Sequence, residues 1–93
     1  MAQDQIEALV TSTLGPIQRY DGDRGTLLLD TVRAYFDEEG RVAAAADRLF
    51  VHTNTLYQRL ARVDKLLGPD WRTGDRALEI RLALRLLTLA EQG

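Results

Sequence analysis

Two amide side chains lie four residues apart near the middle of the chain, in a segment that also carries cations. The amides are Asn54 and Gln58, and the cations are Arg59, Arg62 and Lys65. An amide offers a donor and an acceptor side by side, which is the pattern that pairs with the edge of adenine in the major groove. Guanidinium and ammonium groups bind phosphate oxygens. These residue types therefore indicate recognition of a nucleic acid.

A single helix can place these residues on one face. Leu56, Leu60, Val63 and Leu67 recur at i, i+4, i+7 and i+11, which is one apolar stripe at helical period. We therefore expect a helix over residues 53–67 that buries this stripe. Its opposite face carries Asn54, Gln58, Ala61 and Lys65, with Tyr57 and Arg62 at the edges of that face.

A shorter, Ala-rich helix is expected just before this one, ending at Leu49. Residues 50–52 interrupt the helical pattern, and Thr53 opens the next helix. Small residues let the second helix approach closely while its polar face stays outside. This is the layout of a helix-turn-helix, whose second helix enters the major groove of DNA. The core of the motif is predicted at residues 41–67.

Residues 45–60 read AADRLFVHTNTLYQRL. They match the pattern AA-x-x-L-x-VH-x-NTL-x-x-RL and so resemble the helix-turn-helix of PucR-type (purine catabolism regulator) transcription factors. The flanking segments 27–40 and 66–71 agree as well, and the resemblance covers roughly residues 14–90. The spacing is also similar to the Fis-like helix-turn-helix. The resemblance implies an all-α fold, a small helical bundle of five or six helices that contains a Fis-like helix-turn-helix.

The resemblance implies a function as well, namely sequence-specific binding of double-stranded DNA as the output domain of a transcriptional regulator. PucR-like regulators resemble this chain only at their C-terminal end. We therefore expect residues 1–93 to be one domain excised from a longer regulator, with any effector bound by an upstream domain. A free-standing small regulator is the alternative. Symmetric half-sites would require a homodimer.

The base-contacting candidates are Thr53, Asn54, Tyr57 and Gln58. Relatives commonly carry Arg at positions 53 and 57 and Tyr at position 58. The inherited sequence preference is therefore expected to differ in this chain. For Asn54 and Gln58, the alternative is that they are solvated polar residues on an exposed helix.

The phosphate-contacting candidates come from the same helix and its start. His52 either caps the helix or meets a phosphate, and the Thr55 hydroxyl either reaches a phosphate or bonds back into its own helix. The alternative for Arg59 is an ion pair with an acidic residue of the preceding helix. The full set is His52, Thr55, Arg59, Arg62 and Lys65.

The formal net charge of −2 argues against DNA binding, but its distribution does not. Residues 1–40 carry a net charge of −5, whereas residues 41–72 carry +3. The excess of positive charge thus falls on the predicted helix-turn-helix, as expected for a surface that binds phosphate. A rival interpretation is a helical interaction or dimerisation module that no longer binds DNA. The acidic total charge and the departures at Thr53 and Tyr57 motivate it.

Outside the motif we expect four helices. A short helix over 3–13 is expected to break at Gly15-Pro16, and a second covers Pro16–Tyr20. An amphipathic helix over 24–38 would be capped by Asp23. The last helix, of about 16 residues, places Leu78, Leu82, Arg85 and Leu89 on one line. It is apolar over more than one stripe, so it must be covered by the core or by a partner chain.

Several local features are also expected around these helices. Gly40 ends the 24–38 helix in the left-handed conformation, and Gly68-Pro69 stops the 53–67 helix. Phe50 stands in the turn where many helix-turn-helix proteins have Gly, so that turn is either not left-handed or mildly strained. Trp71 and Tyr35 are expected in the core, with Trp71 beginning a loop.

The sequence speaks against several other classes. With no cysteine and one histidine, neither a disulfide nor a zinc site is expected, and no cofactor or other metal is indicated. There is no phosphate-binding glycine loop and no arrangement typical of a nucleophile, so we expect no enzyme activity. No apolar run reaches membrane-spanning length, and we expect a cytoplasmic protein.

Overall fold

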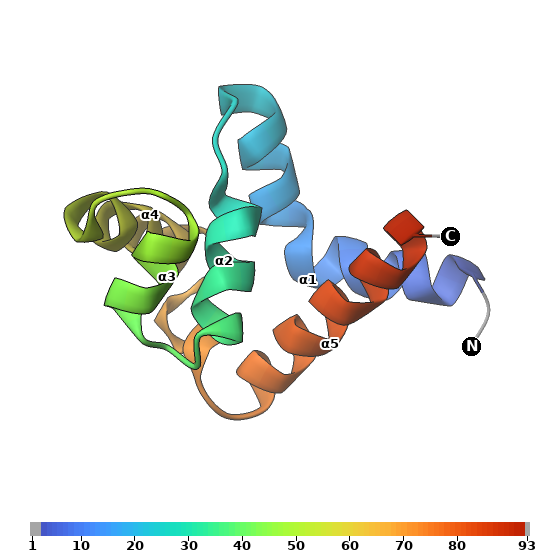
Figure 1. The fold of residues 1–93 in the computed structure, drawn as a ribbon. Helices are drawn as coiled ribbons and strands as arrows, with labels where there is room; N and C mark the ends of the chain where they lie inside the picture. The colour runs from blue at the N-terminus through green and yellow to red at the C-terminus, as the bar shows by residue number, and fades with distance from the viewer. Residues whose placement is uncertain (1–2, 93) are drawn as a thin grey trace.

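The computed structural model describes residues 3–92 of the chain. These residues form five α-helices and one short 3-10 helix, with no strand among them, so the all-α prediction is confirmed (Figure 1). None of the helices in this part of the chain is long and apolar enough to cross a membrane. The elements are α1 (Gln3–Arg24), α2 (Leu28–Asp37), α3 (Val42–Arg48), α4 (Thr53–Leu67), η1 (Pro69–Arg72) and α5 (Gly74–Gln92).

The predicted break at Gly15-Pro16 is wrong, because α1 runs through Pro16 without interruption. Proline lacks the N–H of the helical ladder and crowds the preceding turn, which costs about 3 kcal/mol and bends a helix rather than always ending it. Figure 1 shows α1 bending near its middle. Leu14 and Ile17, on either side of Pro16, are fully buried. Packing of both halves against the core thus holds the helix together across the proline.

The predicted cap of the next helix is also wrong. α2 begins at Leu28 rather than near residue 24, and the carboxylate at its N-terminus is Asp21 rather than Asp23. Asp21 Oδ1 accepts a hydrogen bond from the Leu28 backbone N–H at 2.9 Å, and Oδ2 accepts from the Leu29 N–H at 2.9 Å. The last turn of α1 is therefore tied directly to the first turn of α2.

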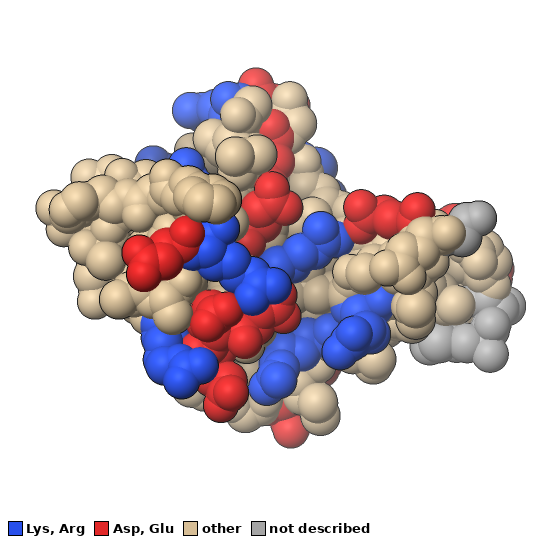
Figure 2. Space-filling view, in the orientation of Figure 1, with Lys and Arg blue, Asp and Glu red and all other residues tan. Residues whose placement is uncertain are grey.

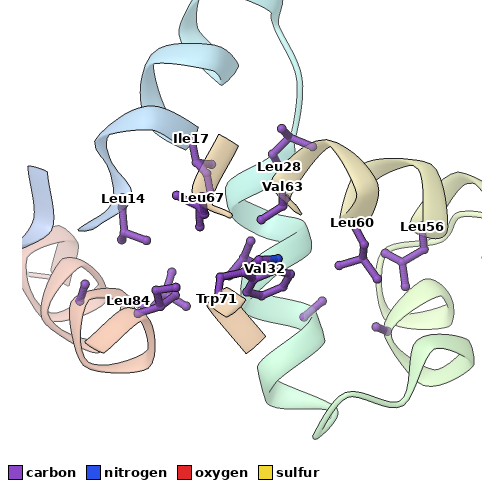
Figure 3. Close-up of a cluster of buried hydrophobic side chains, with 14 of the residues drawn as sticks. Leu14, Ile17, Leu28, Val32, Leu56, Leu60, Val63, Leu67, Trp71 and Leu84 are labelled. Atoms are coloured by element: carbon purple, nitrogen blue, oxygen red, sulfur yellow. The ribbon is translucent and has the colours of Figure 1, made fainter. Parts of the chain in front are cut away.

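Buried side chains of all five helices and η1 form one apolar cluster (Figure 3). Trp71 is fully buried and lies in η1. The prediction that it begins a loop is therefore wrong. Its ring is 5.3 Å from that of Tyr35 and 5.6 Å from that of Phe36, measured between centroids. The expected core position is confirmed for Trp71, while Tyr35 is half-buried at its edge.

The last helix, α5, has 19 residues and packs mainly on α1. Its inner face buries Ile80, Ala83 and Leu84. Two leucines of the apolar line that was predicted for this helix remain exposed to solvent: Leu78 is 67% exposed and Leu82 is 50% exposed. Within residues 3–92 the core therefore covers only part of the apolar surface of α5.

Candidate nucleic-acid interface

α3 and α4 form a helix-turn-helix with the bounds that the sequence predicted. The turn closes by two backbone hydrogen bonds, from Val51 N to Ala46 O at 3.0 Å and from Phe50 N to Asp47 O at 3.1 Å. This pattern ends α3 with one residue in the left-handed conformation, and Phe50 takes it with φ of 58°. Of the two predicted possibilities, the strained turn is the one observed. The Phe50 side chain is 94% exposed, so packing does not offset that strain.

His52 caps the N-terminus of α4. Its Nδ1 accepts a hydrogen bond from the Asn54 backbone N–H at 3.0 Å, which satisfies one of the free N–H groups of the first turn. Because Nδ1 acts as the acceptor, the proton of the neutral ring lies on Nε2. His52 is exposed, so this N–H remains available to an acceptor outside the chain. The capping role and a phosphate contact are therefore compatible.

The predicted stripe of α4 is buried, which turns the candidate residues outward. Leu56, Leu60, Val63 and Leu67 all belong to the core. Ala45 and Ala46 of α3 are buried against them and allow the close approach that the sequence indicated. The exposed candidates are His52, Asn54, Tyr57, Gln58, Arg62 and Lys65, and the half-buried ones are Thr53, Thr55 and Arg59.

The structure also bears on two alternatives. Thr55 does not bond back into α4: its hydroxyl has no hydrogen bond with any residue of 3–92. Arg59 forms no ion pair with the preceding helix or with any other described residue. Both side chains thus retain their polar groups for a partner, although neither observation identifies that partner.

The cations of the molecule fall into two groups. Arg33, Arg41 and Arg48 are paired with carboxylates of α2, of α5 and of Glu38, which follows α2. The shortest contacts are 2.7 Å from Arg33 to Glu91 and 2.8 Å from Arg48 to Glu38. Figure 2 shows this face, where acidic and basic atoms alternate. By contrast, the cations of α4 form no ion pair within the described residues; these are Arg59, Arg62 and Lys65. The outer face of α4 thus carries three cations whose charge no carboxylate of the described residues neutralises.

Arg62 contacts a residue that the sequence did not place beside α4. Its guanidinium carbon lies 5.6 Å from the ring centroid of Tyr20, and that of Arg24 lies 5.3 Å from the same ring. Tyr20 and Arg24 both lie in the last turns of α1. Neither Tyr20 nor Arg24 was a predicted site residue, because that prediction drew only on the helix-turn-helix segment. The only local signal was the cluster of Arg and Tyr itself.

The C-terminal end of α4 is anchored through Asp64. Its Oδ1 accepts hydrogen bonds from the Trp71 indole at 2.7 Å and from Arg72 at 3.0 Å. Burial alone would lower the pKa of Arg72, but hydrogen bonds and charge interactions with Asp64 and Tyr35 outweigh it and raise the pKa above its usual value. Asp64 and Arg72 therefore neutralise each other and position α4 against the core.

Comparison with known proteins finds sequences similar to this segment. A family model described as the PucR C-terminal helix-turn-helix domain matches residues 28–86. The purine catabolism regulatory protein of Bacillus subtilis is 36% identical over 62 residues, and the carbohydrate diacid regulator of Escherichia coli is 38% identical over 64. The DNA-binding transcriptional activator AdeR of B. subtilis is 26% identical over 74 residues.

The matches differ in how much of each chain they cover. They include 67%, 69% and 80% of this chain, in the order given above, but only 12%, 17% and 18% of the three relatives. The shared segment is thus a small part of each of those proteins. No solved structure matches the chain.

Proposed function

The chain belongs to the family of PucR C-terminal helix-turn-helix domains, and from this premise we propose that it binds double-stranded DNA sequence-specifically as the output domain of a cytoplasmic transcriptional regulator. α4 would enter the major groove, as the second helix of such a motif does. The single observation that carries the proposal is the outer face of α4. It combines exposed amides with cations that have no acid to pair with inside residues 3–92.

In this proposal the two halves of the α4 surface have different tasks. Thr53, Asn54, Tyr57 and Gln58 face the base edges, where the amides would form two-point contacts with adenine. Tyr57 is 58% exposed, and its ring can pack on a thymine methyl group. The flanking groups bind phosphates and fix the register of the helix without reading sequence. They are His52, Thr55, Arg59, Arg62 and Lys65.

A salt titration tests the proposal. We expect the chain to bind duplex DNA of mixed sequence weakly, with log K falling by about 0.9 per phosphate contact for each tenfold rise in salt. Selection from random duplexes should then enrich a preferred site. Folded protein that fails to bind at low salt would refute DNA binding and favour a helical interaction module instead.

The proposal extends to a homodimer. Leu78, Leu82 and Leu89 are 67%, 50% and 57% exposed and recur with Arg85 at the spacing of a helix–helix seam. A second copy of α5 would cover this face, and two copies of α4 would then meet two half-sites. Sedimentation over a concentration series should show a monomer–dimer equilibrium. A chain that stays monomeric at high concentration would exclude α5 as the dimer contact of this domain.

The proposal also includes an upstream effector-binding domain in the whole regulator. It rests on the small share of each relative that the match covers, 12–18%. An effector would then change DNA affinity only in the longer protein. Titrating candidate effectors against both lengths of protein tests this. An effect on residues 1–93 alone would contradict it.

A further inference from the structure

The C-terminal end of α1 precedes the family match, which starts at residue 28, yet it touches the recognition helix. Tyr20 is the contact residue, and the guanidinium groups of Arg24 and Arg62 both lie over its ring, at 5.3 and 5.6 Å from the centroid. Their guanidinium carbons can therefore be no more than 10.9 Å apart, the sum of those distances. Two cations from different helices thus share one aromatic side chain.

This arrangement orients the two cations without neutralising them. An aromatic ring attracts a guanidinium without neutralising its charge, so its N–H groups can still donate to phosphate oxygens. The side chains of Arg24 and Arg62 form no ion pair and no hydrogen bond with residues 3–92, and both residues are exposed.

The position of the pair is fixed by the fold. Asp21, next to Tyr20, accepts hydrogen bonds from the N–H groups of Leu28 and Leu29, so its carboxylate is committed to α2. The same bonds hold the last turn of α1. Asp23 is the remaining carboxylate of that turn and is exposed. Figure 2 shows basic atoms at this end of α1, on the side towards α4.

Arg62 links this pair to the DNA-facing side of the motif. It lies at the edge of the α4 face that carries Gln58 and Lys65, and it is exposed there. In Figure 1 the second half of α1 lies next to the helix-turn-helix, and α1 and α4 are in contact. A duplex whose groove receives α4 would therefore bring a strand of its backbone past the edge where α1 stands.

We propose that Arg24 and Arg62, oriented by Tyr20, bind the phosphate backbone beside the groove that α4 enters. The phosphate-binding surface then extends beyond the helix-turn-helix onto α1. The inference rests on the proposed DNA-binding function and adds a partner contact that the motif alone does not contain. Tyr20 acts as a positioning residue, because it holds the two cations rather than the DNA.

Arg24→Gln tests the inference, with Arg81→Gln as its matched control. Arg81 is also exposed, also has no ion pair among the described residues, and also lies over a ring, that of Phe36 at 5.6 Å. Both variants lose one charge. Binding to mixed-sequence duplex DNA is measured over a range of salt, and thermal unfolding verifies that each variant is folded.

We expect Arg24→Gln to make the negative slope of log K against log salt shallower by about 0.9 and to weaken binding roughly eightfold at 0.1 M salt. Arg81→Gln should change neither the slope nor the affinity. Adding Arg62→Gln should remove about 0.9 more. Tyr20→Leu keeps both charges but removes the ring and should weaken binding, whereas Tyr20→Phe should restore it. That rescue separates positioning by the ring from any role of the hydroxyl.

Two results would overturn the inference alone. In the first, the unaltered chain binds DNA and Arg24→Gln binds with the same slope. In the second, Arg24→Gln and Arg81→Gln lower the slope equally, which would mean that only net charge matters. Failure of the unaltered, folded chain to bind at low salt would instead remove the proposed function, and this inference with it.

Discussion

α4 and α5 each bury an apolar face in the core, but their outer faces differ in chemical character: that of α4 is polar, and that of α5 carries exposed leucines. α4 turns Asn54, Gln58 and Lys65 outward, whereas α5 turns Leu78 and Leu82 outward. A polar face with unpaired cations is suited to a polyanion, and an exposed apolar line is suited to another apolar surface. The comparison shows that this small bundle carries two exposed surfaces of different chemistry. The core secures both helices, but it does not determine what either binds.

The largest expected effect is a loss in the free energy of unfolding when a leucine of the inner face of α4 is truncated, compared with a leucine of the outer face of α5. Leu60→Ala removes a fully buried side chain and should lower the free energy of unfolding by about 2–5 kcal/mol. Leu82→Ala makes the same chemical change at an exposed site and should stay within about 0.5 kcal/mol in the monomer. Urea denaturation at low protein concentration measures both. Equal losses would mean that Leu82 is covered within the single chain.

The next largest effect concerns the hydrogen bonds between α4 and η1, the short helix that connects α4 to α5. Asp64→Ala leaves the Trp71 indole and Arg72 without their acceptor and should cost about 1–3 kcal/mol. Asp47→Ala is the control, because Asp47 is exposed on α3 and forms no ion pair within residues 3–92. Thermal unfolding of the pair measures the difference. A similar melting temperature for both variants would show that the Asp64 contacts do not hold α4 in place.

On the outer face of α4, base reading can be separated from phosphate binding. Gln58→Ala should cost about 1–3 kcal/mol on the preferred site and relax the preference at one base pair. Arg62→Ala should weaken binding to all sequences about equally and lower the salt slope by about 0.9. A panel of sites with single base-pair changes tests both. If Gln58→Ala shifts every site by the same amount, the reading role passes to Thr53 and Asn54.

The smallest effect lies at the turn that leads into α4. Phe50→Gly should raise stability by up to about 1 kcal/mol, because glycine takes the positive φ without strain and the exposed ring packs on little. Phe50→Ala removes the same ring but keeps the strain, so it should match the original protein. Chemical denaturation compares the three. A loss of stability in Phe50→Gly would show that the ring makes a contact that its exposure conceals.

Much of the helix-turn-helix could be predicted from the sequence because its signals are local. The period of Leu56, Leu60 and Val63 predicted both the bounds of α4 and its buried face. Gly68 ended α4 with positive φ, as expected of a residue without a Cβ. After α2 the expectation for Gly40 was met only in part: Gly40 has a φ of 79°, but Glu39 before it already takes the left-handed conformation, with a φ of 55°. The base- and phosphate-contacting roles of the outward residues remain predictions, since they depend on a partner.

The sequence by itself determined where α4 begins and ends, because its apolar period and the glycine after its last turn act over a few neighbouring residues. Only the tertiary structure decided that α1 continues through Pro16, since burial of Leu14 and Ile17 offsets the local cost of the proline. It likewise decided which cations are neutralised and which are not. Whether Arg62 meets a carboxylate or the ring of Tyr20 depends on packing between helices far apart in the chain, and no local pattern encodes that contact.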